Sequence, residues 1–179
     1  MTFEEIGHID VSGVNKIHHI VFQDENTFWV NDGSECLRQT DMQGQILHTI
    51  KTASNGDGIH TFTEHENRNG DVIVTSNGNK KVVVVMDRSG RYRFSYTGNP
   101  GNSIANPWGV VTDILKNILI CDSDNKRIQI INEDGMFLAY INVPNAYGFL
   151  SAVDVDDMHY VWVGFSSSGT IRKFRYLQE

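Results

Sequence analysis

The sequence of 179 residues contains only two cysteines and three prolines. Two cysteines cannot supply the multi-cysteine zinc sites of a RING finger or a B-box, and they do not make the disulfide framework of a small secreted domain. Cys36 and Cys121 stand far apart in the chain. We interpret both as reduced thiols of an intracellular, cytoplasmic protein, while a disulfide between them stays open as the alternative.

Long apolar runs and an excess of basic residues are also lacking. No run approaches the roughly 18 apolar residues needed to span a membrane, and the acidic start of the chain does not resemble a signal peptide. The formal net charge is −7. Residues 1–60 hold three basic and nine acidic side chains, so most of the negative charge lies in this segment. This balance argues against a general nucleic-acid-binding face but leaves a local basic patch possible in the later residues.

No helical period is sustained anywhere, and Gly, Asn and Asp interrupt the sequence about every ten residues. Instead, one short apolar stretch occurs four times, at residues 27–32, 71–76, 117–122 and 160–165. The equivalent positions Val30, Val74, Ile120 and Val163 are 44, 46 and 43 residues apart. A period in the low-to-mid forties built from short strands is typical of β-propeller blades.

The pattern therefore predicts an all-β protein, with residues 1–179 forming a single β-propeller domain of four four-stranded blades. The expected bounds are about 14–52, 57–99, 105–143 and 147–176 for the four blades. The last repeat is one strand short, whereas residues 3–11 resemble a spare outer strand. We expect this N-terminal strand to complete the last blade and close the ring, which removes two exposed sheet edges.

Closure within one chain predicts a monomer. A homodimer in which two chains pool their blades into one eight-bladed ring remains the alternative. Short connections between successive repeats and the entropy lost on association favour the monomer.

Several motifs of the third and fourth repeats resemble NHL repeats. They are Pro107-Trp-Gly-Val-x-x-Asp113, Asn117-Ile-Leu-Ile-Cys-Asp-Ser-Asp-Asn-Lys-Arg-Ile-Gln-Ile130 and Glu133-Asp-Gly135. Residues 91–98 and 161–176 are similar to other parts of the propellers of tripartite-motif ubiquitin ligases, in particular those of the expanded invertebrate, mollusc-like set. The resemblance implies a module that recognises a substrate protein. NHL propellers usually have six blades, so this chain resembles a first blade joined to the last three.

An alignment of the repeats that allows two extra residues in the first turn of the second repeat places four side chains at one position. This position starts the innermost strand, at one mouth of the central channel, and its occupants are His18, His60, Trp108 and Ser151. We expect this ring to contact the partner, with Trp108 as an anchor. Two histidines without a nearby carboxylate make a poor metal site, so we expect no metal, and the alternative is that they are polar residues at solvated loop ends.

Basic residues recur near the start of the third strand of each later repeat: Lys80, Lys81, Lys126, Arg127, Arg172 and Lys173. They predict a basic face that contacts RNA or an acidic peptide, or else a set of solvated strand ends with ion pairs between blades. Asp122 and Arg127 are expected to orient a hairpin and bridge to the neighbouring blade.

No nucleophile elbow or phosphate-binding loop occurs, and the channel positions supply at most two metal-binding side chains. We therefore expect a non-enzymatic scaffold, without a cofactor, that binds a protein partner through one loop face. Single-stranded RNA is the alternative ligand, and a metal enzyme in the channel is a third hypothesis.

Overall fold

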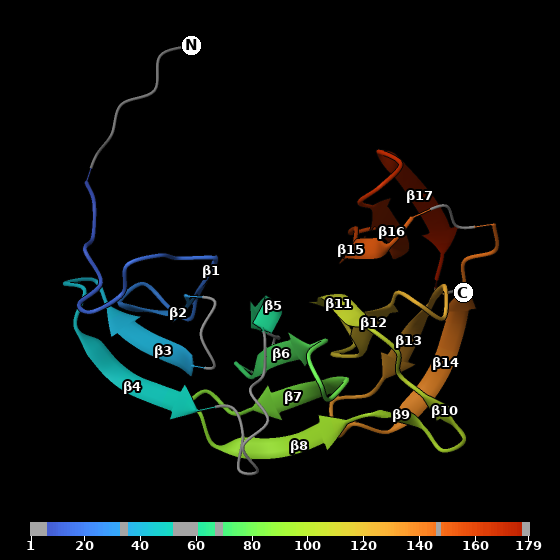
Figure 1. Ribbon diagram of the computed structural model, residues 1–179. Coiled ribbons are helices and arrows are strands. Elements are labelled where there is room, and N and C mark those ends of the chain that lie inside the picture. The colour runs from blue at the N-terminus through green and yellow to red at the C-terminus, as the bar shows by residue number, and fades with distance from the viewer. Residues whose placement is uncertain (1–6, 33–35, 52–60, 67–69, 146–147, 177–179) are drawn as a thin grey trace.

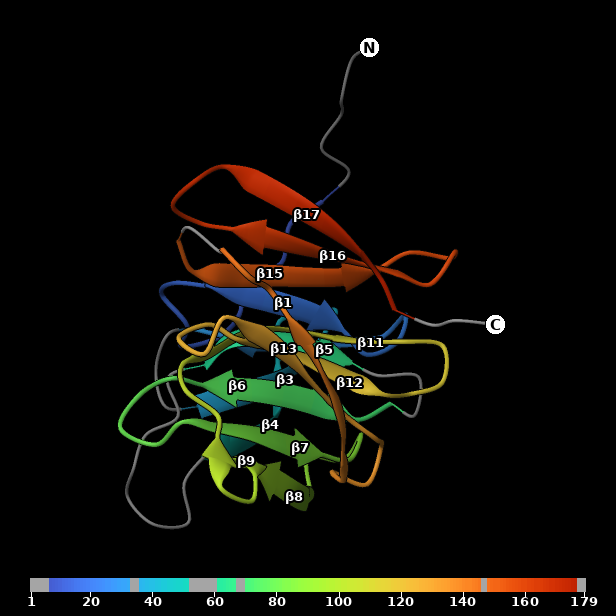
Figure 2. The ribbon, with the colours of Figure 1, turned by 90° about the vertical axis from the view of Figure 1, so that its right-hand side faces the viewer.

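The computed structural model describes residues 7–32, 36–51, 61–66, 70–145 and 148–176. These residues contain seventeen strands and no helix, which confirms the all-β prediction. Consequently, no described segment is a helix long and apolar enough to cross a membrane. Four antiparallel sheets lie side by side in an arc, with the first strand of each sheet toward the centre (Figure 1). Viewed from the side, the strands run across the picture and the loops gather at their two ends (Figure 2).

We call the four sheets blades 1 to 4, in chain order. Blade 1 consists of β1 (His19–Phe22), β2 (Thr27–Asn31), β3 (Cys36–Asp41) and β4 (Ile46–Lys51). Blade 2 consists of β5 (Thr61–Glu66), β6 (Val72–Ser76), β7 (Val82–Met86) and β8 (Tyr92–Tyr96). Blade 3 consists of β11 (Pro107–Thr112), β12 (Ile118–Asp122), β13 (Arg127–Ile131) and β14 (Phe137–Asn142). Blade 4 has only β15 (Leu150–Val155), β16 (Tyr160–Phe165) and β17 (Thr170–Arg175). A two-stranded hairpin of β9 (Gly98–Asn99) and β10 (Asn102–Ser103) links blades 2 and 3.

The second strands of blades 2 and 3 are almost wholly apolar, as expected of strands that are covered on both faces. Every residue of β6 and β12 is buried. Three clusters of buried side chains lie between successive blades, one for each blade-to-blade contact. Burial of this apolar surface between blades is the main force that holds the arc together.

An Asx-type turn connects the third strand to the outer strand in blades 1 to 3. In blade 2 the Asp87 carboxylate accepts hydrogen bonds from the backbone amides of Ser89 and Arg91 at 2.9 and 3.0 Å. Asp41 and Asn132 cap the equivalent turns in the same way. Gly90 has a φ of 79°, in the left-handed region that glycine tolerates best.

The prediction that an N-terminal strand pairs with the last blade is not met in the described part of that segment. Residues 7–11 form no strand, and among the described strands β17 pairs only with β16. Instead Val11, with Ile9 beside it, packs on Phe28 and Val30 of blade 1. Blade 4 lies at the opposite end of the arc from this segment (Figure 1). The segment lies there because its apolar side chains cover Phe28 and Val30 on the free face of blade 1, and this burial is stabilising. Residues 3–6 of the expected strand lie outside the described residues.

Candidate binding face

The strands of each blade end at two loop faces. One face holds the tight Asx turns, and we call it the turn face. The other holds the connections from the second to the third strand and from each blade to the next, and we call it the linker face. The linker face carries the longer connections, including residues 97–106 with the β9–β10 hairpin. Loops on a rigid scaffold are where binding residues are usually found.

Three of the expected channel-mouth residues lie on the linker face. His18 is exposed just before β1, and its backbone amide donates to the carbonyl of Asn31 at 2.8 Å. Trp108 and Ser151 lie near the starts of β11 and β15 and are partly buried. These two positions are brought together, because a Cβ on the adjacent Gly109 would lie only 2.9 Å from the Ser151 carbonyl oxygen.

The strand register changes the alignment of blade 2. Glu66 pairs with Val72, six residues later, and the equivalent pairs Phe22–Phe28, Thr112–Ile118 and Val155–Val161 have the same spacing. The first turn of blade 2 therefore has no extra residues, and that assumption of the sequence alignment is wrong. Phe62, rather than His60, occupies the position equivalent to Trp108. His60 itself lies outside the described residues.

Trp108 is held in one orientation by its surroundings. Its indole Nε1 donates to Oδ1 of Asn106 at 3.0 Å, and its carbonyl accepts a hydrogen bond from the Thr75 hydroxyl at 2.8 Å. Asn106 in turn donates to Asp124 at 3.0 Å and has a positive φ of 61°. One side of the ring packs on the core between blades 3 and 4. A partly exposed tryptophan fixed in this way can contact a partner at a low cost in conformational entropy.

A second aromatic residue on the linker face was not singled out from the sequence. Phe149 is 47% exposed, and the Lys126 ammonium lies 5.5 Å from the centre of its ring. The same ammonium donates to the Gly148 carbonyl at 2.8 Å. Little in the sequence indicates an exposed side chain here, because Phe149 stands next to the apolar Leu150 and the two together resemble a core segment.

The expected basic residues do not occupy one equivalent position. Arg127 pairs with Asp122 at the end of β12, whereas Arg172 pairs with Val163, two positions deeper in its blade. Lys80 and Lys81 precede β7 and are exposed. The linker-face group is therefore Lys80, Lys81 and Lys126.

The three remaining basic side chains have structural contacts. The Arg172 guanidinium donates to the carbonyls of Pro144 and Asn145 at 2.7 and 2.8 Å, and so joins blade 4 to the preceding linker. The Lys173 ammonium lies 3.6 Å from Asp156 and 3.9 Å from the centre of the Tyr160 ring. These contacts fit the alternative in which the basic residues hold strands and linkers together.

Asp122 is the centre of a buried polar network. Its side chain accepts hydrogen bonds from the Ala105 amide, Arg127 Nε and Gln129 Nε2, at 2.8, 2.8 and 2.5 Å. Asp122 and Arg127 thus orient their hairpin and contact the linker, whereas the link to blade 2 is made by Gln129, which accepts a hydrogen bond from the Tyr96 hydroxyl at 2.6 Å. Burial raises the pKa of the Tyr96 hydroxyl well above its ordinary value. The network orders the linker between blades 2 and 3 and leaves these groups unavailable to a ligand.

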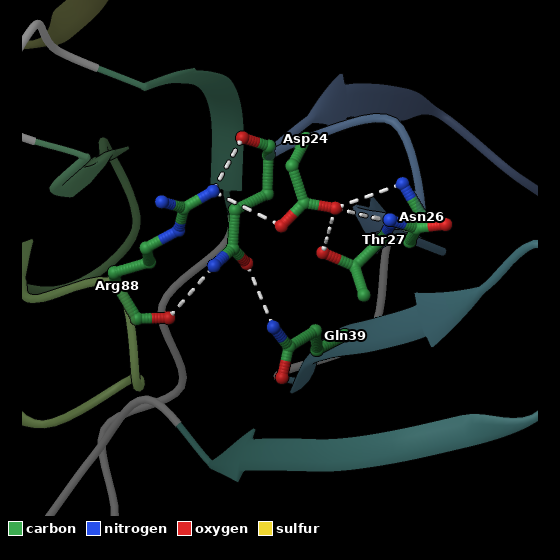
Figure 3. Close-up of polar contacts among 6 residues, drawn as sticks. Asp24, Asn26, Thr27, Gln39 and Arg88 are labelled. Carbon is green, nitrogen blue, oxygen red and sulfur yellow. Dashed lines mark hydrogen bonds and ion pairs between the residues drawn. The ribbon is translucent and has the colours of Figure 1, made fainter.

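An ion pair joins blades 1 and 2 on the turn face (Figure 3). Arg88 Nη2 lies 3.0 Å from Asp24 Oδ2 and donates to the Gln23 carbonyl at 3.1 Å. Asp24 also caps its own turn, and the hydrogen bond from the Asn26 amide is the main reason that its pKa is lowered. This pair is a structural contact that fixes blades 1 and 2 relative to each other at the turn face.

Metal-binding side chains do not gather in the part of the chain that the structure describes, where no group of three His, Cys, Asp or Glu residues could hold an ion. Cys36 and Cys121 form no disulfide with each other, since Cys121 is buried in blade 3 while Cys36 lies in blade 1. One hollow of about 40 Å³ is lined by Phe165, Ser168, Thr170 and Arg172. Small-molecule sites are typically about 300–1,000 Å³, so this hollow is too small for such a ligand.

The comparisons with known proteins place the chain among β-propellers. No family model and no curated protein matches it. Among solved structures, the WD40 β-propeller domain of Doa1 is 18% identical with a TM-score of 0.69, over 91% of this chain and 51% of that one. The WD40 repeats of RRP9 are 14% identical with a TM-score of 0.75, over 90% of this chain and 48% of that one.

An enzyme has the same fold. A catalytically inactive virginiamycin B lyase from Staphylococcus aureus, solved with quinupristin, is 17% identical with a TM-score of 0.71. The match covers 93% of this chain and 58% of the lyase chain. The chain spans 54% and 60% of the lengths of two further propeller-like structures that it matches. Identities this low show the β-propeller fold alone, since scaffolds and enzymes share it.

Proposed function

We propose that this protein is a non-enzymatic binding scaffold that recognises a protein partner through the linker face of its propeller. The observation that carries the proposal is the orientation of Trp108, which is partly exposed and fixed by hydrogen bonds where the inner strand begins. Phe149, on the same face, adds an exposed aromatic surface beside the Lys126 ammonium. Aromatic side chains held rigidly are the most frequent anchors of protein interfaces.

The resemblance to NHL repeats also supports a role in binding a protein partner. In that interpretation the chain is an NHL-type propeller of the tripartite-motif kind and acts as a cytoplasmic substrate-recognition module. The channel-mouth residues His18, Trp108 and Ser151 then lie at the rim of the contact surface, with Lys80 and Lys81 at its periphery. His60 belongs to the same proposal, although it lies outside the described residues.

Affinity capture with matched variants tests the proposal. We expect specific proteins to be retained by the wild type and lost when Phe149→Ser and Trp108→Phe are combined. Leu115→Ser is the control, since Leu115 is equally large and apolar, is 61% exposed and lies on the turn face. Retention by the control together with loss in the double variant supports a linker-face contact. Equal retention by all three proteins would contradict it.

Single-stranded RNA is the second candidate ligand, favoured by the exposed Lys80 and Lys81 on the same face. Binding of a random RNA pool should then weaken steeply as salt rises, because each phosphate contact releases counterions. Lys80→Gln combined with Lys81→Gln should reduce both the affinity and the salt slope. No binding at low salt would remove this alternative.

The absence of catalysis is part of the proposal and has its own test. Elemental analysis of the purified protein should find no stoichiometric metal. One tightly bound transition-metal ion per chain would instead favour a channel-bound metal enzyme.

A further inference from the structure

The free face of blade 4 has the residues of a blade interior. By strand register, Trp162 is equivalent to Trp29, Ile73 and Leu119, each of which is fully buried against the next blade. Trp162 is 37% exposed. Ile171 is likewise equivalent to a fully buried set, namely Leu37, Val83 and Ile128, but is 69% exposed. Two adjacent positions that are buried in every other blade are thus uncovered in this one.

The free face of blade 1 has the complementary character. Ile20 is 50% exposed, whereas its equivalent in blade 3, Val110, is 4% exposed because it packs on blade 2. Phe22, on the same face, is 59% exposed. Blade 1 therefore presents the face that normally contacts a preceding blade, and blade 4 presents the face that normally contacts a following one.

The N-terminal segment occupies the place of a preceding blade's outer strand. A Cβ on Gly90 of blade 2 would meet Ile50 of the preceding outer strand β4 at 2.7 Å. A Cβ on Gly135 of blade 3 would meet Phe94 of β8 at 2.7 Å. Gly44 is the equivalent glycine of blade 1, and its neighbours are Asp10 and Ile9. The segment is thus already docked where the outer strand of another blade would lie.

We propose that this docked segment and the free face of blade 1 join blade 4 of a second copy of the chain. The segment would then pair with the unpaired edge of β17 of the other copy, as its missing fourth strand. The same contact would form twice around a two-fold axis, so that each copy completes the other. This differs from the closed monomer expected from the sequence, because the two ends lie apart on the arc (Figure 1).

The copy is the fitting occupant because each chain carries both halves of the contact. Three blades are complete, one lacks an outer strand, and one segment sits unpaired in an outer-strand position. The chain also superposes on 48–58% of the Doa1, RRP9 and lyase chains, which are therefore longer than one arc of this kind. Two arcs joined end to end make one closed ring of eight blades without an exposed sheet edge.

The turn glycines limit the proposed pairing to two registers. The outer-strand residue beside Gly90 is Ile50, which pairs with Leu37, the equivalent of Ile171, whereas the one beside Gly135 is Phe94, which pairs with Val85, the equivalent of Lys173. Ile9, which lies beside Gly44, should therefore face Ile171 or Lys173, and Gly7 should face Lys173 or Arg175. Directly opposed residues of antiparallel strands have Cβ atoms about 4.5–5.5 Å apart, close enough for an introduced disulfide after a small adjustment.

Mixing two variants, each with one introduced cysteine, tests both the identity of the partner and the strand register. The background is Cys36→Ser, because Cys121 is fully buried and does not compete. One protein carries Gly7→Cys, where a side chain would meet nothing within 4 Å, and its partner carries either Lys173→Cys or Arg175→Cys, one for each register. Mild oxidation of one of these mixtures should give a covalent pair of twice the 20.2 kDa chain mass. A mixture of Gly7→Cys with Met136→Cys, on an exposed turn, is the control for random collisions.

Light scattering completes the test. The wild type should have twice the chain mass, and Ile171→Lys should have the mass of one chain with an unchanged circular dichroism spectrum. A wild-type monomer would overturn the proposal, as would cross-linking no greater than in the control. A double variant with Gly7→Cys and Lys173→Cys that forms its disulfide within one chain would also overturn it, in favour of a closed four-bladed ring.

Discussion

Aspartate has different roles at the two ends of the blades. On the turn face Asp41 and Asp87 are partly exposed and cap tight turns with their carboxylates. On the linker face Asp122 is fully buried and accepts hydrogen bonds from four residues. Sequence position alone did not separate these roles, because each aspartate follows or ends a strand. The difference lies in what surrounds the carboxylate, which depends on the packing of the next blade.

Asp87→Asn should reduce the acid sensitivity of the protein. Hydrogen bonds, first that from the Ser89 hydroxyl, lower the pKa of Asp87 to about 2. A lowered folded-state pKa contributes stability that is present above the unfolded-state value near 4 and is lost as the pH falls toward 2. Asn132 shows that asparagine caps the equivalent turn. The melting temperature of the variant, measured by thermal scans, should therefore fall less between pH 6 and pH 3 than that of the wild type. Equal losses would show that the cap has no net electrostatic contribution.

Asp122→Ala should destabilise the fold strongly. The substitution leaves Gln129 and the largely buried Arg127 without their acceptor, and breaking such a buried pair costs about 3–5 kcal/mol. The melting temperature should fall by roughly 10 °C, since 1 kcal/mol corresponds to about 2–4 °C in a domain of this size. Asp157→Ala, in an exposed turn, is the control and should change stability by less than about 0.5 kcal/mol. A similar fall for both variants would contradict the role of the network.

The two thiols should differ in reactivity. Burial raises the pKa of Cys121 well above its usual range and also excludes reagents, whereas Cys36 is only partly buried. A thiol reagent should label one cysteine per native chain and two in denaturant, counted by mass spectrometry. Rapid labelling of both native thiols would show that blade 3 opens readily.

At the scale of elements, the second strands and their turns were the predictable part. A fully apolar run bounded by polar turn residues indicates a strand covered on both faces, and residues 118–121 and 72–74 are buried as that pattern predicts. The alignment of blade 2 was less predictable, because residues 57–66 contain several plausible starting points for the inner strand. Only the pairing of Glu66 with Val72 fixes the register.

Gly109→Ala tests how closely the inner strands of blades 3 and 4 approach. A Cβ would lie 2.9 Å from the Ser151 carbonyl oxygen and 3.0 Å from the Ala152 Cα, both backbone atoms that cannot move aside. Overpacking of this kind costs about 1–3 kcal/mol, which should lower the urea midpoint measured by tryptophan fluorescence. Gly7→Ala is the matched control, because its Cβ would meet nothing within 4 Å. An unchanged midpoint for Gly109→Ala would mean that the strands lie further apart.

At the scale of the whole molecule, the repetition of similar antiparallel sheets was foreseeable but the arrangement of the ends was not. The period of the repeats indicates four blades and one spare segment, and the described residues form three four-stranded sheets, one of three strands and the two-stranded β9–β10 sheet, which was not foreseen. Where the spare segment lies depends on the curvature of the arc, which results from side-chain volumes between the blades. No local pattern encodes that curvature, so closure within one chain or between two could not be decided from the sequence.

Deleting residues 1–12 should lower the melting temperature by several degrees. The deletion removes Ile9 and Val11 and uncovers Phe28 and Val30, which are 1% and 0% exposed in the intact protein. Burial of one aliphatic side chain is worth about 1.5–3 kcal/mol, and the two together account for a fall of this size. A shorter deletion of residues 1–6 keeps both side chains and is the control.

A synthetic peptide of residues 1–15 should restore the lost stability when it is added to the truncated protein. The peptide would dock in the outer-strand position beside Gly44, and a ligand that binds only the folded state raises the melting temperature with the logarithm of its concentration above the dissociation constant. If the same segment also pairs with β17 of a second copy, the truncated protein should have the mass of one chain, and saturating peptide should restore the double mass, because the docked peptide rebuilds the same contact surface. If the truncated protein and the wild type had the same melting temperature, the segment would contribute neither packing nor pairing.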